Sequence, residues 1–143
     1  PPRREKMRRQ PRRVRGSLRW LVVIVVAALI FVASVVRPGP GIANLGPFGL
    51  LYVSTWLHVG AYGFLTLTLL YALLADGEAI VHPVVVPVIV ISYGAFIELV
   101  QFPIAYRSFA VGDILANGIG SLVVVAIWMA GRSVLVHFEL RHS

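Results

Sequence analysis

Seven polar residues interrupt otherwise apolar stretches of the chain, where a polar side chain is expensive to place in lipid. An imidazole and a carboxylate can exchange protons, a guanidinium can hold a phosphate or a carboxylate, and side-chain amides can orient the bound group. These residue types therefore predict a site that binds or modifies an anionic molecule. The seven residues are His58, Tyr62, Glu98, Gln101, Arg107, Asp113 and Asn117.

Side-chain chemistry divides the seven residues into two candidate roles. Proton transfer favours the imidazole and the carboxylates, so the candidate catalytic residues are His58, Glu98 and Asp113. The candidate substrate-binding residues are Tyr62, Gln101, Arg107 and Asn117. No metal or cofactor is predicted, because the spacing of the acid and base residues matches no zinc signature and the chain has no cysteine.

The same residues also have a structural interpretation, and the sequence leaves both open. Glu98 needs a partner, and Arg107 is the nearest cation along the chain, so we expect these two side chains to be in contact or bridged by water. His58 and Tyr62 lie four residues apart, hence on one helix face, and could form a polar contact between helices. Asp113 carries a favourable charge for a helix N-terminus.

Composition places these residues in a membrane protein. The 143 residues are 58% hydrophobic and only 13% charged, against about 25% charged in a typical soluble domain. The charged residues are clustered, so four stretches of membrane length contain no Asp, Glu, Lys or Arg. A water-soluble globular domain is therefore excluded. The four stretches are 20–36, 38–75, 79–97 and 114–131.

The predicted fold is all-α: a compact antiparallel bundle of four transmembrane helices. Short loops rich in Gly and Pro or in acidic residues separate the helices, which favours antiparallel neighbours. One membrane domain, 17–136, follows a basic arm, 1–16, which we expect to be disordered, and precedes a short tail, 137–143. The expected spans are 20–36, 51–75, 83–102 and 113–131.

The basic residues predict the orientation of the bundle. Nine of the thirteen Lys and Arg residues precede the first span, and two more follow the last, whereas the opposite side has two. This bias predicts a multi-pass protein of the cell membrane with both termini in the cytoplasm. It also explains the net charge of +7 by attraction to anionic lipid headgroups, without a nucleic-acid ligand. All seven polar residues would then lie in the outer half of the bundle.

The order and spacing of these residues resemble the successive motifs of VanZ-like membrane proteins. The resemblance covers about positions 54–125. It implies a small polytopic protein of the cell envelope, in a family linked to resistance to the glycopeptide teicoplanin. The matching motifs are His58-x-x-x-Tyr62, Gly94-x-x-x-Glu98-x-x-Gln101, Arg107, and Asp113-x-x-x-Asn117-x-x-Gly120.

The chain departs from the family pattern at two places. Family members commonly carry an acid and a Lys shortly before the His, where this chain has Ser54 and Thr55. They also commonly carry an Asp three residues after the Arg, where this chain has Ala110. If the missing groups are catalytic in the family, the activity of this protein is altered; if they only tune the loop, the core can still work.

Two functions are compatible with this sequence. In the first, a polar pocket in the outer leaflet binds or modifies an anionic envelope lipid or glycan precursor. In the second, the polar cluster is structural and the protein is a noncatalytic scaffold that recruits a membrane-protein partner. Membrane lipids are partners in both cases. A transporter is less favoured, because the first span and the cytoplasmic halves of the other spans lack ionisable residues that would continue a path.

Overall fold

The computed structural model describes residues 3–74, 82–107 and 110–142, and within these ranges it describes side chains over residues 16–134. Every regular element in this part of the chain is a helix. There are four α-helices and one short 3₁₀ helix, η1, in the first loop. Their bounds are α1 (Arg3–Val35), η1 (Pro47–Gly49), α2 (Val53–Leu74), α3 (Val85–Gln101) and α4 (Val111–His142).

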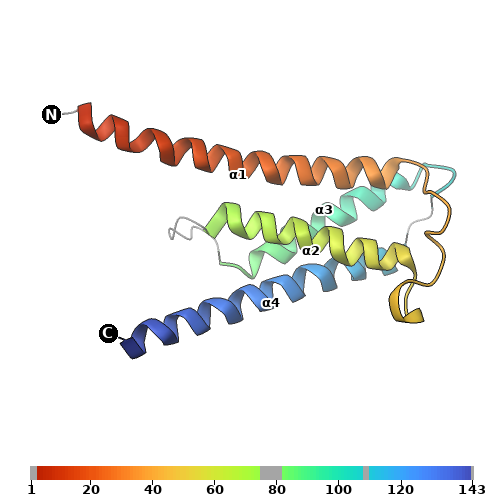
Figure 1. Ribbon diagram of the computed structural model, residues 1–143. Coiled ribbons are helices and arrows are strands. Elements are labelled where there is room, and N and C mark those ends of the chain that lie inside the picture. Colours follow the sequence, from red (N-terminus) through yellow and green to blue (C-terminus); the bar gives the residue numbers. More distant parts are fainter. Residues whose placement is uncertain (1–2, 75–81, 108–109, 143) are drawn as a thin grey trace.

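The helices form an antiparallel bundle, which confirms the predicted all-α fold (Figure 1). The two chain ends lie at the same end of the bundle. The α1–α2 loop and the α3–α4 loop lie together at the opposite end, here called the loop end (Figure 1). In the same view α1 and α4 lie on opposite sides, with α2 and α3 between them.

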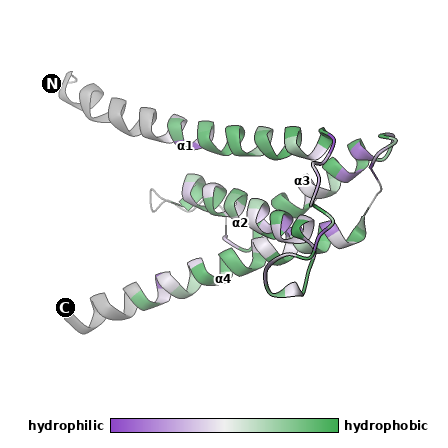
Figure 2. Ribbon diagram, turned by 45° about the vertical axis from the view of Figure 1, so that its right-hand side comes forward, coloured by the Kyte–Doolittle hydropathy of each residue, from purple (hydrophilic) through white to green (hydrophobic). Residues whose placement is uncertain are grey.

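Among the described residues, three helices are long and apolar enough to cross a membrane. They contain the stretches Gly16–Val35, Val53–Leu74 and Val111–Val134. Most of the length of these stretches is coloured as hydrophobic in Figure 2, as expected for helices that contact lipid. The fourth, α3, is also apolar but has only 17 residues and a length of about 25 Å. A helix satisfies its own backbone hydrogen bonds, which is why apolar spans in lipid adopt this form.

Two helices extend beyond their expected bounds. The first begins at Arg3, within the arm expected to be disordered, and the last continues past residue 131 to His142. Arg, Lys, Glu and Met are good helix formers, and a preformed apolar helix removes the cost of starting a new one. Both extensions lie at the end of the bundle that carries the termini (Figure 1).

The core lies between α2, α3 and α4, and the α2–α4 contact is the most extensive in the bundle. Glycines make this contact close: a Cβ atom at Gly120 would collide with the backbone carbonyl of Val59, and one at Gly63 would touch the carbonyl oxygen of Gly120. Nearby, the buried hydroxyls of Thr66 and Ser121 are hydrogen-bonded at 2.7 Å. Small residues thus bring α2 and α4 together, as in many membrane helix pairs.

Candidate functional site

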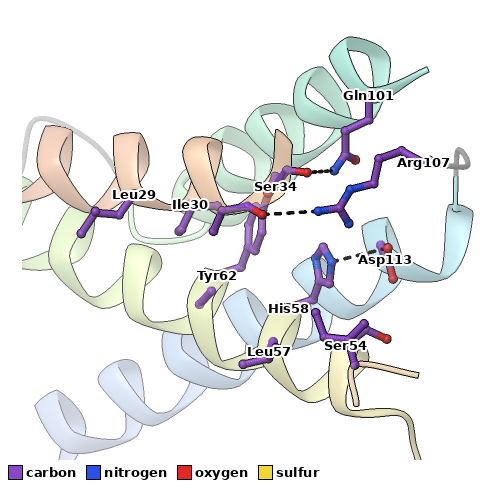
Figure 3. A pocket seen from close by; sticks show the side chains of 13 residues that line it. Leu29, Ile30, Ser34, Ser54, Leu57, His58, Tyr62, Gln101, Arg107 and Asp113 are labelled. Atoms are coloured by element: carbon purple, nitrogen blue, oxygen red, sulfur yellow. Dashed lines mark hydrogen bonds and ion pairs between the residues drawn. The ribbon is translucent and has the colours of Figure 1, made fainter. Parts of the chain in front are cut away.

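A cavity of about 370 Å³ opens near the loop end, between α1, α2 and the start of α4. One wall is apolar and comes from α1 and α2; the other is polar and comes from α2, α4 and the end of α3 with the loop that follows it (Figure 3). Five of the seven predicted site residues line it: His58, Tyr62, Gln101, Arg107 and Asp113.

The polar wall is organised around His58, whose two ring nitrogens face two oxygen atoms of α4. Its Nδ1 lies 2.9 Å from Oδ1 of Asn117, and its Nε2 lies 3.4 Å from Oδ2 of Asp113. Asp113 and Asn117 are four residues apart, so both side chains project from one face of α4. The imidazole is therefore held by two residues of the neighbouring helix, and Figure 3 shows the contact with Asp113.

The two contacts of His58 give its two ring nitrogens different partners. With Oδ1 of Asn117 as acceptor, the imidazole proton resides on Nδ1 and the lone pair of Nε2 faces the Asp113 carboxylate. A ring nitrogen that faces a carboxyl group is a geometry used in general acid–base chemistry. His58 and Asp113 are both only partly exposed, at 21% and 30% of their side-chain surface, and both line the cavity.

Asn117 is buried behind the cavity wall, and a glycine on α3 makes the room for it. A Cβ atom at Gly94 would lie 2.5 Å from Nδ2 of Asn117 and 3.1 Å from Cε1 of Tyr62. The Tyr62 ring in turn stacks on His58, with ring centroids 6.0 Å apart. His58 thus makes the polar contact between helices that the sequence allowed, a hydrogen bond to Asn117 on α4, and it contacts Tyr62 as a ring stack within α2.

Glu98 is also buried behind the wall, and its partner differs from the predicted one. Its Oε2 accepts a hydrogen bond of 3.1 Å from the backbone amide of Ala110, the residue before α4. A carboxylate at this position satisfies an amide at the helix N-terminus and matches the helix dipole. The direct contact with Arg107 is not among the ion pairs of the described residues, although Arg107 is near enough to interact with the Glu98 charge.

Arg107 instead caps the C-terminal end of α1. Its Nη2 donates a hydrogen bond of 2.7 Å to the carbonyl of Val36 and a longer one, 3.4 Å, to that of Ala33. Carbonyls at a helix end lack intrahelical donors and carry a partial negative charge, which attracts a cation. The direct ion pair that was one form of the expected Glu98–Arg107 contact is therefore absent among the described residues, and the two groups satisfy two different helix ends.

Two further side chains near the α3–α4 connection share in this cap. Nε2 of Gln101 donates to the carbonyl of Ser34 at 2.7 Å, and the Tyr106 hydroxyl donates to that of Val35 at 2.7 Å. Sequence reasoning selected Gln101 for a site role but missed Tyr106. No residue type marks this contact in advance, because its acceptors are backbone carbonyls that every residue has.

The structure thus brings all seven predicted residues to the loop end, in two layers. Five line the cavity, and Glu98 and Asn117 lie behind them. Ser54, which stands where the resembled family commonly has a charged residue, also lines the cavity. Among the described residues, no group of three or more His, Cys, Asp and Glu side chains is arranged to hold a metal ion.

Comparison with known proteins adds no relative: no family model, no curated protein and no solved structure matches the chain.

Proposed function

We propose that this protein is a VanZ-like membrane protein whose cavity binds, and through His58 can modify, an anionic lipid or glycan precursor of the cell envelope. The observation that carries this proposal is the composition of the cavity wall. A guanidinium and a His–Asp pair stand on one side, and apolar residues of α1 and α2 stand on the other. An amphipathic molecule with an anionic headgroup is complementary to such a wall.

Arg107 is the centre of the anion-binding proposal. Its guanidinium lines the cavity while Nη2 is engaged with α1 carbonyls, and its Nε is buried without a hydrogen-bond partner among the described residues. A buried donor without an acceptor costs free energy, so the guanidinium is not fully satisfied by its protein contacts. Guanidinium groups bind phosphate and carboxylate oxygens with several parallel hydrogen bonds, which adds specificity to charge.

The orientation of the cavity in the membrane is part of the same proposal. The charge bias of the sequence favours cytoplasmic termini, and the termini lie at the end of the bundle opposite the loops. The cavity would then face the outer leaflet, where envelope precursors are displayed. Because the chain has no cysteine, Gly39→Cys introduces a single thiol in the first loop, and an impermeant reagent should label it in intact cells. Labelling only after lysis would overturn this orientation.

A second candidate, a noncatalytic scaffold, is favoured by a specific observation. Most polar groups of the site already have protein partners: Glu98 the Ala110 amide, Asn117 the His58 ring, and Gln101 the Ser34 carbonyl. In that case the cluster stabilises the bundle, and the protein acts through its surface on a membrane-protein partner.

Lipid binding distinguishes the two candidates. The protein is placed in bilayer discs that contain equal parts of phosphatidic acid and phosphatidylcholine, and the lipids that remain bound after release are quantified by native mass spectrometry. We expect enrichment of phosphatidic acid, a partial loss with Arg107→Lys, and a loss of about tenfold with Arg107→Ala, equivalent to about 1.4 kcal/mol. Arg132→Ala, an exposed cation on α4 away from the cavity, is the matched control.

His58→Gln tests the same site without removing the cap on α1. It should weaken phosphatidic acid enrichment while the thermal stability of the protein changes less than with Arg107→Ala. If the wild type binds both lipids equally and only stability responds to the variants, the scaffold interpretation replaces the binding one.

A further inference from the structure

The cavity reaches the lipid-facing surface of the bundle between α1 and α2. Leu29 on α1 and Leu57 on α2 both line it, yet these residues are 63% and 54% exposed. Ala33, one turn after Leu29, also lines the cavity and is exposed. Figure 3 shows Leu29 and Leu57 on the two helices at the apolar side of the cavity, away from Asp113. We call the gap bordered by Leu29, Ala33 and Leu57 the α1–α2 gap.

Contacts between helices close two other sides of the cavity. Toward α4, the backbones of Val59 and Gly120 are in contact, so no molecule passes between α2 and α4 at this level. Toward α3, the Tyr93 hydroxyl donates to the Ala27 carbonyl at 2.6 Å, and Gln101 donates to that of Ser34. These two contacts hold α1 to α3 on either side of Leu29. The α1–α2 gap is therefore an apolar way out of the cavity.

Size gives an independent reason for an opening toward lipid. A volume of about 370 Å³ is near the lower limit of the roughly 300–1,000 Å³ typical of ligand pockets. A membrane lipid with its full hydrocarbon chains is far larger than that. A lipid whose headgroup lies against Arg107 and His58 must leave most of its chain outside, and the chain is stable only in the bilayer.

From these observations we propose that the ligand is a membrane lipid with an anionic headgroup, which enters sideways from the bilayer. Its headgroup binds at the polar wall, and its hydrocarbon chain leaves through the α1–α2 gap between Leu29 and Leu57. This inference rests on the proposed function and specifies its ligand: a phosphate or carboxylate group attached to a long chain that stays in the membrane, not a water-soluble anion that enters from outside.

The test closes the gap without changing the polar wall. Leu29→Trp and Leu57→Trp place a large apolar side chain at the border of the gap, where lipid contact makes the substitution mild for folding. Leu67→Trp and Leu122→Trp are matched controls, because both leucines are exposed on α2 and α4 and neither lines the cavity. Each variant is placed in bilayer discs that contain equal parts of phosphatidic acid and phosphatidylcholine.

Two measurements separate the gap from the headgroup site. The first is the retained phosphatidic acid, measured by native mass spectrometry, which should fall about tenfold in the gap variants and stay at the wild-type level in the controls. The second is the response of the His58 ring resonances to glycerol phosphate, a headgroup without a chain. This response should be the same in the wild type and in all four variants.

The outcomes distinguish a failure of the lateral entry from a failure of the proposed anion binding. If the gap variants retain phosphatidic acid as the wild type does, the lateral entry is wrong and the anion site stands. If they lose the glycerol phosphate response as well, the gap residues act on the headgroup site and the lateral entry is again wrong. If the wild type enriches no phosphatidic acid and shows no response to glycerol phosphate, the proposed function itself fails.

Discussion

The two sides of α2 are built in opposite ways. On the α4 side, Gly63 and Gly120 let the helix backbones touch, and the Thr66–Ser121 hydrogen bond lies in the contact. On the α1 side, a cavity lies between the two helices near the loop end, and α1 is the least buried of the three long spans. One face of α2 therefore fixes the geometry of His58, while the other leaves space for a ligand. A binding site in a small bundle needs both a closely packed wall that positions its polar side chains and a less closely packed wall that leaves room for the ligand.

The largest effect is expected from a substitution that forces α2 and α4 apart. Gly120→Ala places a Cβ atom against the Val59 carbonyl, and because that obstacle is backbone, α2 and α4 must separate. We expect a loss of about 3 kcal/mol in the free energy of unfolding, the upper range for overpacking. Gly60→Ala is the control, because nothing lies within 4 Å of its Cβ position. Equal effects of the two variants would contradict the tight contact.

A smaller loss is expected where the obstacle is a side chain. Gly94→Ala pushes on the Asn117 amide, which can rotate, so we expect a loss of about 1–2 kcal/mol. The same change should weaken the Asn117–His58 hydrogen bond and shift the His58 ring resonances. Gly118→Ala, whose Cβ would meet only Ile91 at 3.5 Å, should leave those resonances in place. Unchanged resonances in Gly94→Ala would show that Asn117 does not hold the ring.

The hydrogen bond between the buried Thr66 and Ser121 hydroxyls contributes the polar part of the α2–α4 contact energy. A double-mutant cycle with Thr66→Val and Ser121→Ala should give a coupling energy of about 0.6 kcal/mol, the average for hydrogen bonds between membrane helices. Unfolding in bilayer discs provides the four free energies. A coupling near zero would assign the stability of this contact to packing alone.

The smallest change in stability is expected on the loose side. Ala61 lies on α2 and lines the cavity, so Ala61→Leu extends into existing space and should change the free energy of unfolding by less than about 0.5 kcal/mol. Ala116→Leu, at a position that is 2% exposed on α4, is the matched substitution on the packed side and should cost about 1–3 kcal/mol. Similar costs at both positions would mean that the two sides of α2 are packed alike.

The positions of the helices follow closely from the sequence. The spans expected at 51–75 and 83–102 are observed as Val53–Leu74 and Val85–Gln101. The reason is physical: lipid excludes both charges and unpaired backbone groups, so gaps between charged residues outline the helices. The polar residues are informative for the same reason, since placing them toward lipid is expensive. Their gathering at one end of the bundle could therefore be anticipated from the sequence.

The pairing of those residues could not be predicted. Glu98 and Arg107 were matched by charge and sequence distance, yet each binds backbone groups at a helix end. Such acceptors and donors occur at every residue and carry no signature in the sequence. The His58–Asn117 contact depends on the register of α2 against α4. That register depends on the close approach of Gly120 to the Val59 backbone, which exists only once the helices are packed together.

The cap on α1 also has a consequence for the order of events during synthesis. The side chains that bind the last carbonyls of α1 lie 67–74 residues further along the chain. At about 5–20 residues per second, roughly 3–15 s pass between the synthesis of that helix end and the arrival of its donors. During this interval the carbonyls need water or lipid headgroups, because the hydrocarbon interior offers no donor. The end of α1 therefore stays at the membrane surface until the α3–α4 connection is synthesised. The first helix to be made is thus the last to have its C-terminal carbonyls hydrogen-bonded.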